Sequence, residues 1–254
     1  MRATNHPAIC FSGKTQSMRV ADALDIKELF ARYRAEHHTF LKPEGVKNDA
    51  LVYVKQHIKG HTMGSRKWAK KAQKLTYFHH YPEQQSYVLG RFIPGKKHFD
   101  FWFSICHYVR TRRGIVYTLE GFGQERLFFF SAHFFDRLAQ RHSGMMFTES
   151  QRDQAIRHGI DFFSRGYNDN DRDPLLLDLD GEAFSVMNGG YAVGQYLNLP
   201  VARPEFPQNQ FGEITVCFFK TFLSDVEIST KRMDRMLQLY RINGIVDLAM
   251  SRCK

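Results

Sequence analysis

The segment FFFSAHFFDRLAQRH, residues 128–142, changes its pattern halfway along. Its first three residues are phenylalanines, as in a strand of a sheet. Beyond Ser131, the polar residues His133, Arg137 and Arg141 recur at every fourth position, which is the spacing of one face of a helix. Because serine is a preferred N-cap residue, the segment predicts a strand that ends at Ser131 and a helix that Ser131 caps.

Further strands are expected on the N-terminal side of this segment. After Pro82 the sequence becomes rich in aromatic and β-branched residues, with glycines between the runs. The runs at 97–109, 114–122 and 125–131 predict a three-stranded meander.

Three more strands are expected on the C-terminal side. EAFSVM (182–187) and YAVGQYLNL (191–199) are joined by Asn188-Gly189-Gly190, and glycine supplies the positive φ angles of a tight hairpin. GEITVCFFKTFL (212–223) is apolar on both faces, which predicts a central strand.

Helical periodicity occurs before, between and after these strands. It predicts helices at 19–41, 43–58, 65–78, 149–164 and 229–251. The chain is therefore expected to be an α+β protein, in which N-terminal helices pack on an antiparallel sheet and a C-terminal helix follows. We expect a helical basic region at 1–82 and an antiparallel-sheet region at 83–254, either as two units or as one continuous domain.

The composition favours a folded protein that attracts polyanions. With 254 residues and 43% apolar side chains, the chain is long enough to bury a core. Lys and Arg total 36 against 26 Asp and Glu, which gives a net charge of +10. A positive field of this size favours nucleic acid as the partner, RNA above all, over an anionic membrane or an acidic protein.

The cysteines and the N-terminus suggest the cytoplasm. Cys10, Cys106, Cys217 and Cys253 are far apart and form no C-x-x-C pair, so neither a zinc site nor a dense disulfide framework is expected. The first 14 residues contain no apolar run of the signal-peptide type, and no stretch has the length of a membrane helix. We therefore expect a reducing compartment, no membrane association and no cofactor.

Two intervals without acidic residues predict nucleic-acid contacts. The first lies between Asp49 and Glu83, and the second, 101–119, includes a hairpin tip. Their candidate phosphate-binding residues are Lys55, Lys59, Arg66, Lys67, Lys70, Lys71 and Lys74 in the first interval and Arg110, Arg112 and Arg113 in the second. Trp68 and Tyr77 are expected to stack on bases. The alternative is a lysine-rich helix that is merely solvated.

The helix after Ser131 carries the residue types needed for phosphodiester chemistry. A histidine exchanges protons near neutral pH, and arginines one turn apart match phosphate oxygens. RNA cleavage through its own 2′-hydroxyl needs a base, an acid and cations, but no metal. The alternative is an ordinary amphipathic helix whose arginines bind surface carboxylates.

This pattern resembles a known module. The segment from His133 through Arg137 to Arg141, followed by a helix, a hairpin and the strand ITVCFFKTF, is similar to the H-x3-R-x3-R module of prokaryotic toxin-like ribonucleases. These belong to the superfamily of barnase, EndoU, the tRNase colicins and RelE. The resemblance covers residues 125–223. The chain departs from such modules in its greater length and in its additional meander.

The resemblance implies a metal-independent endoribonuclease of the toxin type. It makes His133 a catalytic acid or base and Arg137 and Arg141 phosphate ligands. Thr221, or its neighbour Lys220, takes the place of the polar group at the end of the last strand. A toxin of this kind implies an acidic neutralising protein as a further partner.

Two other functions stay open. The chain is alternatively a nucleic-acid-binding protein without catalytic activity, in which the same arginines only hold phosphate. It is alternatively a metal-dependent nuclease, in which Asp178 and Asp180 of the acidic segment 169–180 hold magnesium.

Overall fold

The structure is a computed structural model. It describes residues 20–60, 65–94, 99–112, 114–120, 126–143, 149–164, 175–187, 189–202, 211–239 and 241. The helices are α1 (Val20–Glu36), η1 (His37–Thr39), α2 (Pro43–His57), α3 (Arg66–Ala72), α4 (Ala132–Ser143), α5 (Glu149–Phe163) and a C-terminal helix at 230–239.

One mixed sheet contains all the described strands. They are β1 (Thr76–Tyr81), β2 (Ser86–Pro94), β3 (Phe99–Thr111), β4 (Gly114–Glu120), β5 (Arg126–Ser131), β6 (Leu175–Leu177), β7 (Glu182–Met187), β8 (Gly190–Ala202) and β9 (Phe211–Leu223). Their order in the sheet is β1-β2-β3-β4-β5-β9-β8-β7-β6. The expected α+β class and the C-terminal helix are thus confirmed.

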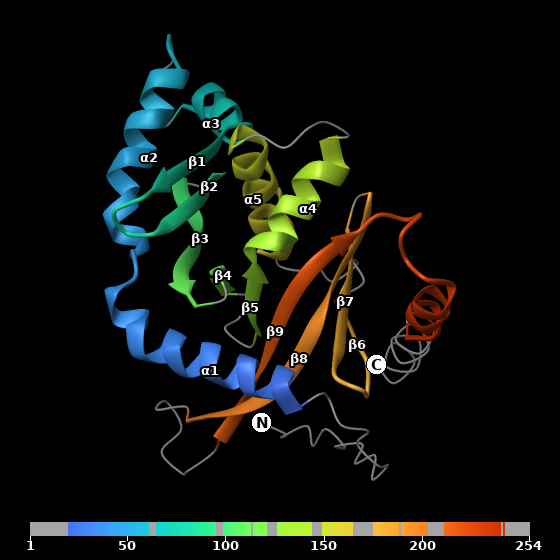
Figure 1. The fold of residues 1–254 in the computed structure, drawn as a ribbon. Helices are drawn as coiled ribbons and strands as arrows, with labels where there is room; N and C mark the ends of the chain where they lie inside the picture. Colours follow the sequence, from blue (N-terminus) through green and yellow to red (C-terminus); the bar gives the residue numbers. More distant parts are fainter. Residues whose placement is uncertain are drawn as a thin grey trace, which may run out of the picture.

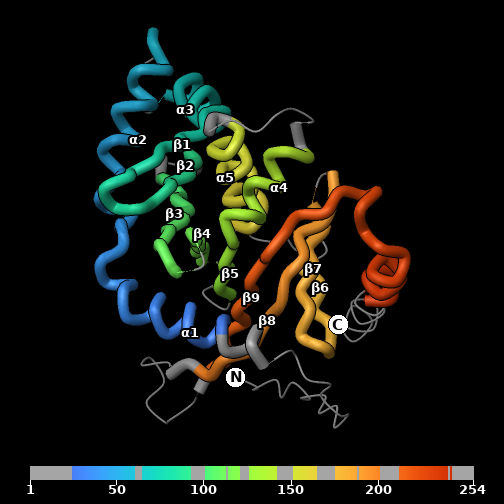
Figure 2. The backbone as a smooth tube through the Cα atoms, viewed as in Figure 1, coloured from blue at the N-terminus to red at the C-terminus, as the bar shows by residue number. Residues whose placement is uncertain are grey.

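The sheet consists of two antiparallel halves joined by one parallel pair. The strands β1–β5 form a meander, and β9, β8, β7 and β6 form the other half (Figures 1 and 2). At the junction β5 runs parallel to β9, with Arg126 opposite Thr215 and Phe130 opposite Phe219. The expectation of an antiparallel sheet therefore holds within each half but not at the junction. The chain between β5 and β9 runs through α4, α5 and the successive antiparallel strands β6, β7 and β8, and it returns so that β9 lies parallel to β5.

The helices α4 and α5 cover one face of the sheet, which we call the α4–α5 face. Its core is largely aromatic, with Phe128 and Phe130 of β5, Phe134 of α4, Phe163 of α5 and Phe219 of β9 all buried. The rings of Phe130 and Phe219 stack at 5.7 Å. This packing fixes both helices to the junction between the two halves.

The opposite face, which we call the α1–α2 face, carries α1, α2 and the C-terminal helix. Ile26 and Phe30 of α1 pack against β4, β5, β8 and β9, and α2 packs through Val46 and Ala50 against β1–β3. Met236 of the C-terminal helix packs against β6–β8. None of the helices in the described part of the chain has both the length and the apolar character needed to cross a bilayer.

Most expected elements are present, but β1, β2 and β6 were not expected, so the meander has five strands where three were predicted. Among the expected helices, the main error lies at 76–78. There, the helix expected at 65–78 ends early as α3, and Thr76 begins strand β1, which pairs with β2. Threonine, tyrosine and phenylalanine favour a pleated surface, and β2 provides the partner strand. The boundary proposed between 82 and 83 lies between these two paired strands, so the sheet is continuous across it.

Candidate functional site

Ser131 joins strand β5, helix α4 and strand β9. Its Oγ accepts a hydrogen bond from the Phe134 backbone N–H at 3.1 Å and donates one to the Lys220 carbonyl at 2.7 Å. The cap expected at Ser131 is therefore present, and it also ties the first turn of α4 to β9.

The α4 stripe, formed by His133, Arg137 and Arg141, is partly engaged. His133 is exposed, and among the described residues Arg137 donates a single hydrogen bond, of 3.5 Å, to Gln140 Oε1. The Arg141 guanidinium forms an ion pair with Glu227 in the turn after β9. Hydrogen bonds from Ser224, and then the Arg141 contact, lower the pKa of Glu227 to about 2.

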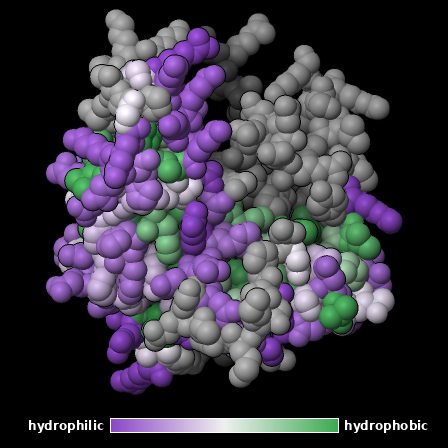
Figure 3. Space-filling view, turned by 90° about the horizontal axis from the view of Figure 1, so that it is seen from above, coloured by the Kyte–Doolittle hydropathy of each residue, from purple (hydrophilic) through white to green (hydrophobic). Residues whose placement is uncertain are grey.

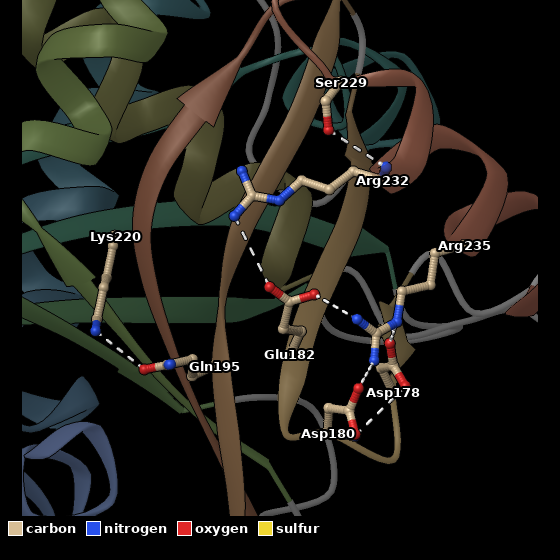
Figure 4. Close-up of polar contacts among 8 residues, drawn as sticks. All are labelled: Asp178, Asp180, Glu182, Gln195, Lys220, Ser229, Arg232 and Arg235. Carbon is tan, nitrogen blue, oxygen red and sulfur yellow. Dashed lines mark hydrogen bonds and ion pairs between the residues drawn. The ribbon is translucent and has the colours of Figure 1, made fainter. Parts of the chain in front are cut away.

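Thr221 lies on the other side of the sheet from this stripe. It is opposite Val193, which packs under the C-terminal helix on the α1–α2 face. Lys220 is the extra residue at a bulge in β9, and its ammonium group donates to Gln195 Oε1 at 3.0 Å (Figure 4). The described geometry thus groups His133, Arg137 and Arg141 but places neither Thr221 nor Lys220 beside them.

The expected basic residues on and around α3 form one exposed surface, which we call the α3 basic surface. Every one of its charged side chains is exposed, namely Lys55, Lys59, Arg66, Lys67, Lys70, Lys71 and Lys74. Hydrophilic side chains dominate the side of the molecule that carries α2 and α3 (Figure 3). A stacking role for Trp68 is wrong, because this ring is only 2% exposed and packs between α2, α3 and β2. Tyr77 is likewise buried.

The arginines of the second basic interval lie far from the α3 basic surface. Arg110 and Arg112 lie at or just beyond the C-terminal end of β3, whereas α3 packs near its N-terminal end. Arg110 lies eight positions along β3 from Trp102, or roughly 26 Å. Arg113 lies outside the described residues. The two intervals therefore do not form a single patch.

A polar cleft opens on the α4–α5 face, beside the α3 basic surface. Its volume is about 890 Å³, which suits a small molecule or a nucleotide. The residues that line it come from the turn after α3, from β1–β3, from α4 and from α5. They are Gln73, Leu75, Thr76, Leu89, Arg91, Phe92, Trp102, Leu138, Ala139, Gln151, Gln154, Ala155, Arg157, His158 and Asp161.

One wall of the cleft is a polar stripe on α5. Gln151, Gln154, His158 and Asp161 follow one another at intervals of three and four, so they lie on one side of the helix. Arg157 is exposed and, within the described chain, has neither a hydrogen-bond nor an ion-pair partner. The α5 wall therefore offers amide, imidazole and guanidinium groups.

The facing wall belongs to the sheet. Thr76, Arg91 and Trp102 are adjacent across β1, β2 and β3, and all three line the cleft. Arg91 forms an ion pair with Asp161, which joins this wall to α5. Gln73 lines the cleft at the end of α3, and its neighbour Lys74 belongs to the α3 basic surface. The cleft and the basic surface are thus continuous along the chain.

The carboxylates considered for magnesium bind an arginine instead. Asp178, Asp180 and Glu182 surround the guanidinium of Arg235 (Figure 4). Within the described residues, no group of three or more His, Cys, Asp or Glu side chains is arranged to hold a metal ion. Residues 169–174 of the acidic segment lie outside the described residues.

The cleft was not predicted from the sequence. The polar stripe of α5 has a helical spacing that the sequence does reveal, whereas the position of Trp102 depends on how three strands align. The three comparisons, with family models, with curated proteins and with solved structures, find no match for this chain. The site is therefore interpreted from its own chemistry.

Proposed function

We propose that the protein binds single-stranded nucleic acid, RNA in preference to DNA. In this proposal an unpaired base occupies the cleft, and the adjoining phosphates lie on the α3 basic surface. The observation that carries it is the cleft itself, where an aromatic ring, two arginines and three glutamine amides face one space.

Each part of the cleft has a counterpart in a nucleotide. Trp102 offers a ring on which any base can stack. The amides of Gln73 and Gln154 can pair with the edge of a base or with a 2′-hydroxyl group, which distinguishes RNA from DNA. Arg157, which has no partner in the described chain, offers a forked donor to phosphate.

The charge of the neighbouring surface supports the same proposal. The seven basic side chains of the α3 basic surface are exposed, and no acidic residue occurs between Asp49 and Glu83. Such a surface attracts a phosphate backbone and makes affinity fall with salt. A duplex would not fit the proposal, because its bases are already stacked and paired.

The test is a salt titration of binding by fluorescence anisotropy, with matched single-stranded RNA, single-stranded DNA and double-stranded RNA. Arg157→Gln is expected to weaken RNA binding about 10-fold and to reduce the slope of log K against log salt by about 0.7. Lys231→Gln, an equal change of charge at an exposed position of the C-terminal helix, is the control. It should leave both the RNA affinity and the salt slope nearly unchanged.

The outcome of this titration is decisive. Equal losses in the two variants would show that only net charge matters, and the cleft would lose its role. Absence of binding to all three nucleic acids at low salt would overturn the proposal itself.

Metal-independent RNA cleavage at the α4 stripe is the second candidate. Arg137 Nε and Arg141 Nη1 are shielded from solvent and have no hydrogen-bond partner among the described residues, one and two turns beyond the exposed His133. His133 would take the proton of a 2′-hydroxyl. The resulting oxygen would attack phosphorus and break the bond to the 5′-oxygen, which takes a proton from water and leaves as a 5′-hydroxyl, so that a 2′,3′-cyclic phosphate remains.

Cleavage is tested with labelled RNA in the presence of EDTA. His133→Ala should abolish cleavage and leave RNA affinity unchanged, whereas His38→Ala, at another exposed histidine, should cleave normally. If the native protein does not cleave RNA, or if His133→Ala cleaves as well as the native protein, the catalytic proposal is wrong and binding alone remains. The cytoplasm fits either function, because the described cysteines, Cys106 and Cys217, are free thiols.

A further inference from the structure

A second cavity lies on the α1–α2 face, on the opposite side of the sheet from the cleft. Its volume is about 340 Å³, it is open to solvent, and residues of α1, η1, β4, β5 and β9 line it. Phe30 and Leu127 form part of its apolar wall, while Arg34 and Arg126 line it with positive charge. Because the sheet lies between the two cavities, this one is independent of the proposed RNA site.

The polar centre of this cavity is the carboxylate of Glu120. Its Oε1 atom accepts a hydrogen bond from the Tyr33 hydroxyl and lies 3.0 Å from His37 Nε2. Burial, and then the Glu120 contact, raise the pKa of Tyr33, so this phenol stays protonated and acts as a donor. Within the described chain, Glu120 Oε2 has no hydrogen-bond partner.

The described residues that line the cavity carry more positive than negative charge. Arg34 and Arg126 are permanently charged, whereas Glu120 is the only carboxylate among the described lining residues. Tyr33 and His37 already occupy the Glu120 oxygen Oε1. Arg34 is exposed and, among the described residues, makes no hydrogen bond or ion pair. Its guanidinium is thus available to an anion.

We propose that this cavity binds a small ligand that combines one anionic group, a phosphate or a carboxylate, with an apolar body. The anionic group pairs with Arg34 and Arg126. The apolar body lies against Phe30 and Leu127, and the unoccupied Glu120 oxygen accepts a hydrogen bond from a hydroxyl or amino group of the ligand. The volume suits a body about the size of one aromatic ring.

The experiment uses three probes of similar shape on the full chain. Phenyl phosphate and benzoate carry the two anionic groups, and benzyl alcohol carries none. Affinity is measured by isothermal titration calorimetry and by saturation-transfer NMR. We expect one or both anions to bind and the alcohol to bind at least 10-fold more weakly, because a charge-assisted hydrogen bond contributes about 1.5–3 kcal/mol. The stronger anion identifies whether phosphate or carboxylate is preferred.

Two exposed arginines provide the matched variants. Arg34→Gln should weaken binding of the preferred anion about 10-fold, while Arg157→Gln, in the cleft on the other face, should leave it unchanged. Both variants keep the contacts of the folded chain, which thermal unfolding verifies. The proposal is overturned if neither anion binds at about 10 mM, or if Arg34→Gln binds as well as the native protein. It is also overturned if Arg157→Gln alone abolishes binding.

Discussion

His107 is a buried histidine that the fold keeps neutral. Its Nδ1 atom lies 2.8 Å from Ser86 Oγ, and its ring stacks on Phe40 at a centroid distance of 4.1 Å. Burial above all, with help from the charges of His37 and Lys42, lowers the pKa of His107 to about 3. In the unfolded chain an ordinary histidine has a pKa of about 6.5. The two states therefore bind different numbers of protons over a wide range of pH.

This difference predicts an acid-sensitive fold. As the pH falls below about 6.5 the unfolded chain gains a proton on His107 that the folded chain does not accept until about pH 3. The contribution of neutral His107 to the free energy of unfolding is therefore complete above pH 6.5 and decreases as the pH falls toward 3. Proton uptake by His107 in the unfolded chain therefore lowers the free energy of unfolding by about 2 kcal/mol between pH 8 and pH 5.

Urea unfolding at these two pH values measures the effect. His107→Asn keeps a hydrogen-bonding group toward Ser86 but cannot titrate, so its loss of stability on acidification should be about 2 kcal/mol smaller than that of the native protein. His38→Asn, at an exposed histidine, should behave as the native protein does. Identical pH dependence in all three proteins would show that His107 is not held neutral.

At the residue scale, a local feature such as a helix cap could be predicted from the sequence, whereas the burial of a side chain could not. Ser131 was identified as a cap because serine before a helix has a local role that does not require the rest of the fold. Trp68 was expected to stack on bases, yet it is buried. Trp68 shares the buried face of α3 with Ala72, four residues on, but its partners Val54 and Phe92 come from two other elements, which the local pattern does not reveal.

The C-terminal helix is held to the sheet by an ionic clamp. Arg235 forms ion pairs with Asp178, Asp180 and Glu182, and Arg232 approaches Glu182 at 3.8 Å. The Asp178 side chain is only 8% exposed, so its charge depends on Arg235 more than on water. Met236 adds an apolar contact to β6–β8.

Removing the arginine should loosen this helix. Arg235→Gln leaves Asp178 without its cation, and we expect a loss of about 1–3 kcal/mol, below the value for a fully buried pair because Arg235 is partly exposed. Urea unfolding measures the loss, and limited proteolysis at 230–239 measures the release of the helix. Lys231→Gln removes an exposed charge from the same helix and should have little effect. If both variants lose the same stability, the clamp has no specific role.

At the element scale, long periodic segments could be predicted well. The strands β3, β4, β5, β7, β8 and β9 and the helices α1, α2, α4 and α5 lie where their periodicity placed them. β1 was missed because its threonine and aromatic residues continue a helical pattern, and only pairing with β2 makes them a strand. The exposure of the α3 basic surface followed from local charge, whereas the cleft required the positions of three distant segments.

At the scale of the whole molecule, β9 joins the two antiparallel halves of the sheet. It lies between β5 and β8, and Phe219 packs against rings of Phe128, Phe130 and Phe163 at 6.3, 5.7 and 5.0 Å. Its parallel pairing with β5 could not be predicted, because both strands are apolar and many registers would bury them equally well. The choice depends on the whole connection from β5 to β9, through α4, α5 and the antiparallel strands β6–β8.

This arrangement predicts that the chain unfolds in one cooperative step. Phe219 is fully buried, and Phe219→Ala should cost about 3–5 kcal/mol through lost contacts and the cavity left behind. The two tryptophans, Trp68 and Trp102, both lie in the half formed by the α3 and β1–β5 segments. Their fluorescence therefore reports on the half that does not contain the substitution. In urea, the midpoint from fluorescence should shift as far as the midpoint from circular dichroism.

Leu237→Ala, at an exposed position, should shift neither midpoint by a measurable amount. If fluorescence keeps the native midpoint while circular dichroism separates into two steps, the halves are independent domains, and the sheet does not transmit the loss from β9 to β1–β5.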